Sequence, residues 1–113
     1  MIRFAFAISL FWLTFAAAPA LAKPAWTFCV ASATGSKEVW ITSLFPASVD
    51  RERLERELKE LIQREAHADV VAQCPQPNED RVYVVNAQTT AEEFNRKLGA
   101  VLHALSPQEF PPR

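Results

Sequence analysis

Two cysteines are the residues of this chain whose chemistry is most distinctive. Cys29 and Cys74 enclose positions 30 to 73, so they form neither a Cys-x-x-Cys redox motif nor a zinc-binding pair. The two histidines, His67 and His103, lie at no ligand spacing from them. The pattern therefore predicts a structural disulfide between Cys29 and Cys74, with no metal site and no cofactor.

The histidines are also the only side chains that suggest acid–base catalysis. Asp69 follows His67 by two residues, and His103 stands beside Leu102. A small envelope hydrolase that uses His67 or His103 with neighbouring carboxylates is therefore the alternative reading. It is the weaker one, because the chain has no Gly-x-Ser-x-Gly motif, and its two glycines do not form a phosphate-binding loop.

The first 22 residues predict export. Arg3 precedes an apolar run from Phe4 to Ala18, Pro19 interrupts it, and Ala20-Leu21-Ala22 is a typical cleavage site. We expect a signal peptide over residues 1–22 and a mature chain beginning at Lys23. An uncleaved membrane anchor is the rival reading of this segment. Cleavage would leave no stable membrane anchor and place the protein in the periplasm or outside the cell, where disulfides persist.

The charge balance gives no support for a polyanionic partner. The whole chain carries a net charge of −1, and loss of Arg3 with the signal peptide makes it −2. A nearly neutral protein has no electrostatic attraction to nucleic acid. We therefore expect no nucleic-acid partner.

A β-hairpin follows the expected cleavage site. Residues 25–33 alternate between two sets of side chains, Gly35 lies in a short connection, and the alternation resumes over residues 38–45. Val39, Ile41 and Phe45 occupy one side of the second strand, and Trp40, Thr42 and Leu44 the other. Pro46 ends the hairpin because it lacks an N–H for the ladder.

A long amphipathic helix is predicted next, from Asp50 to about Ala68, with Ser48 as its N-cap. Leucines and an isoleucine recur at the helical repeat, and the opposite side is almost wholly charged. Such a face of mixed charge is typical of a solvated surface.

The remaining chain predicts one strand and one helix. Val82, Tyr83, Val84 and Val85 form an apolar run that favours a buried strand over residues 81–86. Thr90 and Glu93 are spaced as a capping box for a second helix that extends to about Leu105. The three prolines from Pro107 onward indicate a flexible tail over residues 107–113.

Together these elements predict one small α+β domain over residues 23–106. The order strand–strand–helix–strand–helix favours a two-layer sandwich, in which a three-stranded sheet carries both helices on one face. The first strand would lie between the other two. The disulfide would join that strand to the exit of the long helix, in a core small enough to need it.

A sheet covered on one face leaves the other open. Trp40 and Leu44 would lie on the open face, and Tyr83 would lie beside them. Exposed aromatic side chains on a flat sheet are typical of a binding surface. The sequence therefore predicts a small exported binding or accessory module in preference to an enzyme. Its partner would be an envelope or secreted protein, or a second copy of the chain.

Overall fold

The computed structural model describes residues 23–47 and 50–112, and it has an α+β fold. The predicted signal peptide lies outside the described residues, as does Ser48. The elements, in chain order, are the strands β1 (Trp26–Thr27), β2 (Val30–Ala33), β3 (Glu38–Thr42) and β4 (Phe45–Pro46), helix α1 (Arg51–Ala66), strand β5 (Val70–Gln73), helix α2 (Arg81–Lys97) and strand β6 (Val101–Leu105).

The main sheet has four strands in the order β5-β2-β3-β6, instead of the three predicted. The hairpin of β2 and β3 is confirmed, with Ala31 paired to Trp40. β5 pairs antiparallel with β2, and β6 pairs parallel with β3. The first long strand does lie between the second strand and the strand after α1, as expected. That third strand is Val70–Gln73, however, and not residues 81–86.

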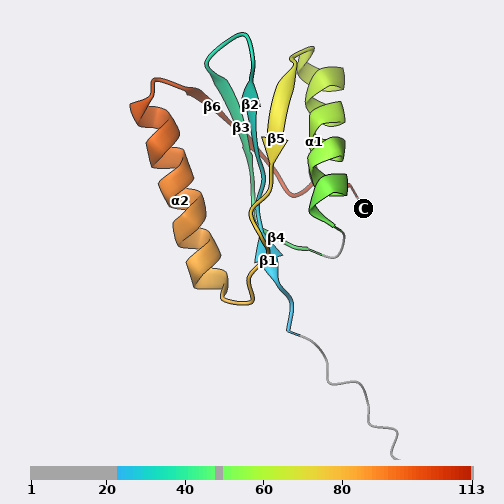
Figure 1. The fold of residues 1–113 in the computed structure, drawn as a ribbon, viewed down its shortest axis with the longest axis vertical. Coiled ribbons are helices and arrows are strands. Elements are labelled where there is room, and N and C mark those ends of the chain that lie inside the picture. The colour runs from blue at the N-terminus through green and yellow to red at the C-terminus, as the bar shows by residue number, and fades with distance from the viewer. Residues whose placement is uncertain (1–22, 48–49, 113) are drawn as a thin grey trace, which may run out of the picture.

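The two helices cover opposite faces of the sheet, so the prediction of both on one face is wrong. Figure 1 shows the sheet nearly edge-on between α1 and α2. Both helices connect parallel strands: α1 leads from β3 to β5, and α2 leads back across the sheet from β5 to β6. Crossovers that run in opposite directions can both be right-handed only if they use opposite faces.

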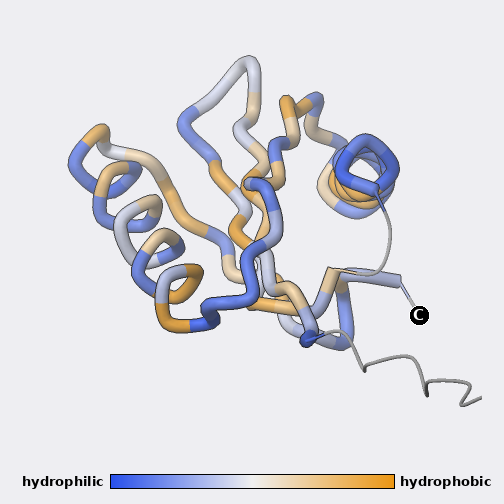
Figure 2. Tube along the Cα trace, turned by 60° about the horizontal axis from the view of Figure 1, so that its bottom comes forward, coloured by the Kyte–Doolittle hydropathy of each residue, from blue (hydrophilic) through white to orange (hydrophobic). Residues whose placement is uncertain are grey.

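Helix α1 has the expected amphipathic pattern, and its packing forms the larger core. Its N-cap is Asp50, whose Oδ1 accepts a hydrogen bond from the Arg53 N–H at 2.8 Å. Leu54, Leu58 and Ile62 are buried against the sheet. Figure 2 shows this helix close to end-on, with its hydrophobic residues turned toward the sheet and its hydrophilic residues turned outward.

A one-residue irregularity in the hairpin changes which side chains share a face. Val30 pairs with Ile41, whereas Thr27 pairs with Phe45, so the second strand has one extra residue between these pairs. An extra residue reverses the alternation of side chains beyond it. Phe45 therefore joins Trp40 in the α1-side core, while Leu44 packs on the α2 side. This is the reverse of the faces predicted for Phe45 and Leu44.

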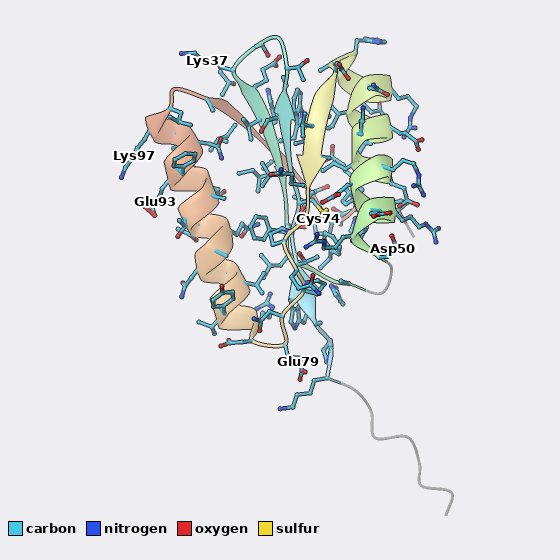
Figure 3. The ribbon with its side chains drawn as sticks, in the orientation of Figure 1. Lys37, Asp50, Cys74, Glu79, Glu93 and Lys97 are labelled. Carbon is cyan, nitrogen blue, oxygen red and sulfur yellow. A yellow bond between two sulfur atoms is a disulfide. The ribbon has the colours of Figure 1, made fainter. Side chains whose placement is uncertain are left out.

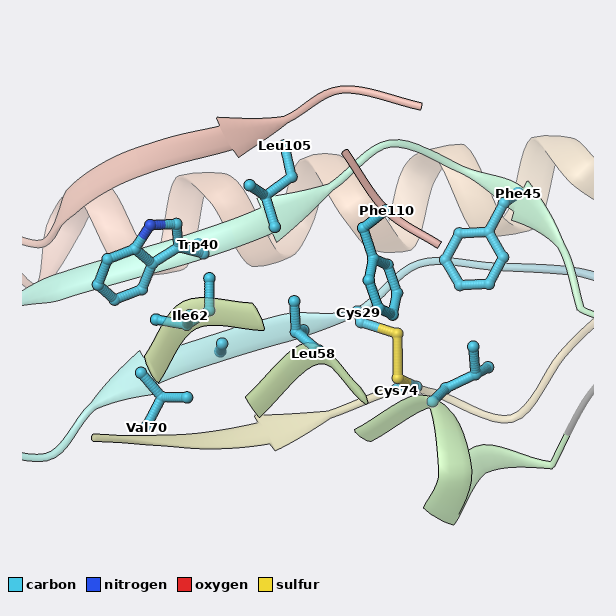
Figure 4. Close-up of a cluster of buried hydrophobic side chains, with 11 residues drawn as sticks. Cys29, Trp40, Phe45, Leu58, Ile62, Val70, Cys74, Leu105 and Phe110 are labelled. Atoms are coloured by element: carbon cyan, nitrogen blue, oxygen red, sulfur yellow. A yellow bond between two sulfur atoms is a disulfide. The ribbon is translucent and has the colours of Figure 1, made fainter. Parts of the chain in front are cut away.

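The disulfide between Cys29 and Cys74 is confirmed. The two residues extend the β2–β5 register by one pair, with their Cα atoms 4.2 Å apart. Both side chains are buried in the α1-side core (Figure 4). The bond therefore closes a loop that contains β2, β3, β4, α1 and β5. The chain-entropy estimate for a loop of this size is about 4 kcal/mol of stabilisation.

The structure corrects the assignment of the last third of the chain. Residues 81–86 begin α2 and are not a strand, and Thr90 and Glu93 lie within that helix and do not cap it. Residues 101–105, expected at the end of a helix, form β6. Gly99 has φ +81°, a left-handed conformation that ends the helix and turns the chain into β6.

The segment after β6 packs on the α1-side core, which differs from the flexible tail predicted over residues 107–113. Phe110 is 1% exposed and meets Phe45 edge to face, with ring centroids 5.8 Å apart. Glu109 and Ser106 hold the turn before it, since the Ser106 N–H donates to Glu109 Oε1 at 2.9 Å. The core therefore extends past residue 106 and includes Phe110 (Figure 4).

Neither α1 nor α2, the helices within residues 23–47 and 50–112, is long and apolar enough to cross a membrane.

Candidate functional site

Helix α2 forms because its first turn is well capped, despite its β-branched residues. Asp80 is the N-cap, and its Oδ1 accepts a hydrogen bond from the Tyr83 N–H at 3.2 Å. Asn78 Oδ1 in turn accepts from the Asp80 N–H at 2.7 Å, which fixes the loop before the helix. Valines cost little in a helix once it is capped and packed, because helix propensity is a weak preference.

Only a narrow side of α2 packs on the sheet. Val84 is its one buried residue, and the small Ala87 and Ala91 are half-buried beside it. Two polar contacts fix the helix on this side. Gln88 Nε2 donates to the Thr42 carbonyl at 2.7 Å, and the Arg81 guanidinium lies 5.0 Å from the centre of a Trp26 ring. The small side chains on this side thus determine how closely the helix packs on the sheet.

One flank of α2 exposes large apolar side chains. Tyr83 and Phe94 are each 61% exposed, and Leu98 just after the helix is 59% exposed. With 3.6 residues per turn, these three lie on the same side as Ala87 and Thr90, about a quarter turn from Val84. We call this strip the α2 flank; it consists of Tyr83, Ala87, Thr90, Phe94 and Leu98. None of its five residues is charged.

The α2 flank faces a part of the sheet that α2 leaves open. A groove is lined by Ala91 of α2 together with Phe28 and Val30, and at its other side by Arg51 and Glu55 of α1. Beyond it, Val71 of β5 is exposed, although its neighbours Val70 and Ala72 pack on the α1 side. Because strand side chains alternate, Val71 projects from the α2 side of the sheet. Apolar side chains of α2 and of the sheet therefore border one open surface.

Charged side chains mark the outer edge of the α2 flank. Figure 3 shows Glu93 and Lys97 extending from α2 on the side away from the sheet, and Glu79 just before the helix. Arg96 and Lys97 lie in the last turn of the helix, while Glu79 and Asp80 precede its first turn. The flank is thus an uncharged strip with acidic residues at one end and a basic residue at the other.

The structure does not bring the three predicted sheet-face residues together. Trp40 is only 6% exposed and lies on the α1 side (Figure 4), and Leu44 is half-buried on the α2 side. Tyr83 is exposed, but it projects from α2 and not from a strand. The three residues therefore do not form one site on the sheet, because Trp40 and Leu44 lie on opposite faces and Tyr83 lies on a helix. Tyr83 is the one predicted residue that lies on the α2 flank.

One histidine has a carboxylate partner. His103 Nε2 lies 3.1 Å from Glu38 Oε1, and the imidazole stacks on Trp40 with ring centroids 5.0 Å apart. Ser36 Oγ donates to the other oxygen of Glu38 at 3.2 Å. The carboxylate thus stands between the hydroxyl and the imidazole. In a catalytic triad the imidazole stands between the other two groups and takes the proton from the nucleophile.

The other histidine caps a helix. His67 is the C-cap of α1, in a left-handed conformation with φ 52°, and its backbone N–H donates to the Gln63 carbonyl. It borders a shallow pocket with Thr34, Gly35 and Asp69. Its role as the C-cap of α1 therefore accounts for its position. Over residues 23–47 and 50–112, no group of three or more His, Cys, Asp or Glu side chains could hold a metal ion.

Sequence reasoning missed the α2 flank because it assigned its residues to two elements. With residues 81–86 predicted as a strand, Tyr83 falls in a different element from Phe94 and Leu98, which lie within the predicted second helix. The clue was Asp80 before the valines, an N-cap residue that allows the helix to begin ten residues earlier than Thr90.

The comparisons with known proteins leave this chain without an assigned family. No protein family model matches it, and it has no significant match among proteins of curated function or among solved structures.

Proposed function

We propose that this chain is a small exported module that acts by binding a protein through the α2 flank. The observation that carries the proposal is the grouping of Tyr83, Phe94 and Leu98, all more than half exposed, on one side of one helix. Exposed large apolar side chains cost solvation free energy, and contiguous apolar patches of this kind are typical of protein-binding sites. This surface replaces the sheet face that the sequence suggested.

The disulfide supports the exported part of the proposal. Such bonds persist in the periplasm and outside the cell and are rare in the cytosol. Cys29 and Cys74 form one inside the core, and their burial limits access of a reductant. A periplasmic or secreted location also agrees with the predicted signal peptide over residues 1–22.

The composition of the flank supports a protein as the partner. Tyrosine and phenylalanine are enriched at the centre of protein interfaces, where an uncharged core is surrounded by a charged rim. The α2 flank has this arrangement, since Glu79, Glu93 and Lys97 border an uncharged strip. A small-molecule site would instead need an enclosed cavity with a few converging polar groups.

Photo-crosslinking in living cells tests the binding surface. The photoreactive residue p-benzoylphenylalanine replaces Phe94 in one variant and Val82 in the matched control. Val82 is equally apolar and 68% exposed, but it lies on a different side of α2. We expect a protein adduct from position 94 at least about ten times more abundant than from position 82, as for a residue central to an interface.

The mass of the adduct then identifies the partner. An adduct from position 94 of any mass, with little from position 82, supports binding through the α2 flank. Absence of an adduct at position 94, or equal yields at the two positions, would contradict the proposed function.

A further inference from the structure

We propose that the α2 flank binds the same flank of a second copy of this chain, with the two α2 helices packed antiparallel about a twofold axis. The inference rests on the proposed function and names the partner. It is drawn from three properties of the flank: the spacing of its large and small side chains, the placement of charge at its two ends, and the direction of the helix.

The spacing of the flank is that of a two-helix seam. Tyr83, Ala87, Thr90 and Phe94 recur at intervals of four, three and four residues, as the core positions of paired helices do. A twofold axis near the midpoint of Gln88 and Thr89 places each residue of this series opposite another residue of the same series in the second copy. Every position of the seam then meets another position of the same seam, which is the requirement for a self-complementary interface.

The side chains in this register fit by size. Phe94 of each copy lies opposite Tyr83 of the other, and Ala87 lies opposite Thr90. The two aromatic layers at the ends bury the most area, and aromatic pairs contribute beyond their burial. The small central residues let the two helices approach closely.

Charge favours the antiparallel direction. The same register places Lys97 of one copy beside Glu79 and Asp80 at the start of the other helix, and the twofold axis creates this contact twice. A parallel pairing would instead place Lys97 beside Lys97 and Glu79 beside Glu79. Antiparallel helices also bring the positive end of each helix dipole near the negative end of the other.

Other charges near the flank do not oppose this pairing. Arg81 turns toward the sheet, where it lies over Trp26. Arg96 lies about a quarter turn from Lys97, on a different side of the helix. Glu93 projects away from the sheet at the outer edge of the flank (Figure 3). In the proposed register the residue opposite Glu93 is Val84, so no like charge meets it.

The size of the surface predicts a weak dimer. Stable interfaces bury about 1,600 Å² in total, and a single pair of short helices is smaller than this. We therefore expect a dissociation constant of about 1–100 μM, with subunits that exchange.

Sedimentation velocity of the exported, oxidised protein tests the inference. We expect a shift from monomer to dimer as the concentration rises through about 1–200 μM, which spans the expected dissociation constant. Phe94→Gln should weaken the dimer by about ten-fold or more, as for an aromatic residue that buries much of its side chain in an interface, and Val82→Gln should not change it. A protein that stays monomeric over the whole range, or a Phe94→Gln variant that dimerises like the wild type, would overturn the inference.

A charge-exchange pair tests the direction of the helices. Lys97→Glu should weaken the dimer by about two- to five-fold, the usual effect of a rim charge pair. Adding Glu79→Lys to the same chain should recover part of the lost affinity, because one of the two acidic neighbours of position 97 becomes basic while Asp80 is unchanged. A double variant that is weaker than Lys97→Glu alone would contradict the antiparallel register.

The crosslinking experiment separates this inference from the proposed function. A position-94 adduct with twice the mass of the chain supports both. Adducts only with other proteins would overturn the second copy as the partner and leave the binding function standing. Absence of any adduct would contradict the proposed function itself.

Discussion

The two helices of this protein use their apolar residues differently. Helix α1 buries Leu54, Leu58 and Ile62 and turns its charged side chains to solvent. Helix α2 is one residue longer but buries only Val84, while Tyr83 and Phe94 remain more than half exposed. A helix whose apolar residues are all buried against its own chain leaves no apolar surface for a partner. A helix that leaves them exposed has apolar surface available for a partner.

The surroundings of the helices differ in the same way. The α1 side contains the disulfide, the aromatic pair of Phe45 and Phe110, and the larger group of buried side chains. The α2 side has a small core around Phe28, Val39 and Ile41. The comparison indicates that the α1 side supplies most of the stability, and that the α2 side contributes less to it.

The largest effect should come from removing the disulfide. The paired substitution of Cys29→Ala with Cys74→Ala should lower the free energy of unfolding by about 4 kcal/mol, because the unfolded chain regains the entropy of an open loop. Urea denaturation followed by tryptophan fluorescence measures it. Thiol titration of the denatured wild-type protein should find no free thiol until a reductant is added. Two reactive thiols without reductant would contradict the disulfide.

Phe110→Ala should cost about 3 kcal/mol, since it removes a fully buried aromatic side chain that contacts Phe45. Thermal unfolding measures the change. Gln108→Ala is the matched control from the same segment, and we expect it to be close to neutral. A neutral Phe110→Ala would mean that residues 107–112 form the flexible tail that the sequence suggested.

Loss of the N-cap of α2 should have a smaller effect. Asp80→Ala removes the acceptor for the Tyr83 N–H and should cost about 1 kcal/mol. Asp50→Ala at the start of α1 removes the matching contact with Arg53 and is the comparison variant. Hydrogen exchange should show faster exchange confined to the first turn of α2 in Asp80→Ala. Faster exchange throughout the α1-side core would contradict the division between the two sides.

The smallest expected effect concerns pH. The backbone and then the side chain of Ser106 hydrogen-bond Glu109, and both hold the pKa of its carboxyl below the usual 4.5. A lowered folded-state pKa adds stability that is complete above the usual value and is lost as the pH falls through the folded value. Glu109→Gln should therefore flatten the decrease in melting temperature below about pH 4.5. An unchanged acid limb in this variant would mean that the turn makes no such contribution.

The hairpin and α1 could be predicted because their patterns are long and consistent with one period each. The α1 repeat extends over four turns, and the alternation in β2 and β3 is interrupted only by the extra residue before Phe45. The class of fold followed from these elements, and the disulfide followed from the number and spacing of the cysteines. The N-cap was displaced by two residues, from Ser48 to Asp50.

The last third of the chain could not be assigned from local pattern alone. Val82 to Val85 fits a buried strand as well as a capped helix, and tertiary packing of Val84 decides between them. Val101 to Leu105 continues the apolar spacing of a helix, but Gly99 ends the helix before it. The α2 flank can be seen only when residues 81–86 and the residues after Thr90 are placed in one helix. To predict which face of the sheet each helix covers, Val70–Gln73 would have had to be recognised as a strand.

The central claim is that the exposed apolar residues of α2 serve association and not folding. The most direct measurement is the free energy of unfolding of Phe94→Gln, in urea and at a concentration where the wild type is monomeric. The account predicts a change of less than about 0.5 kcal/mol, as for a solvent-exposed position. A loss of about 2 kcal/mol or more, the cost of removing a core side chain, would show that Phe94 belongs to the fold and contradict the claim.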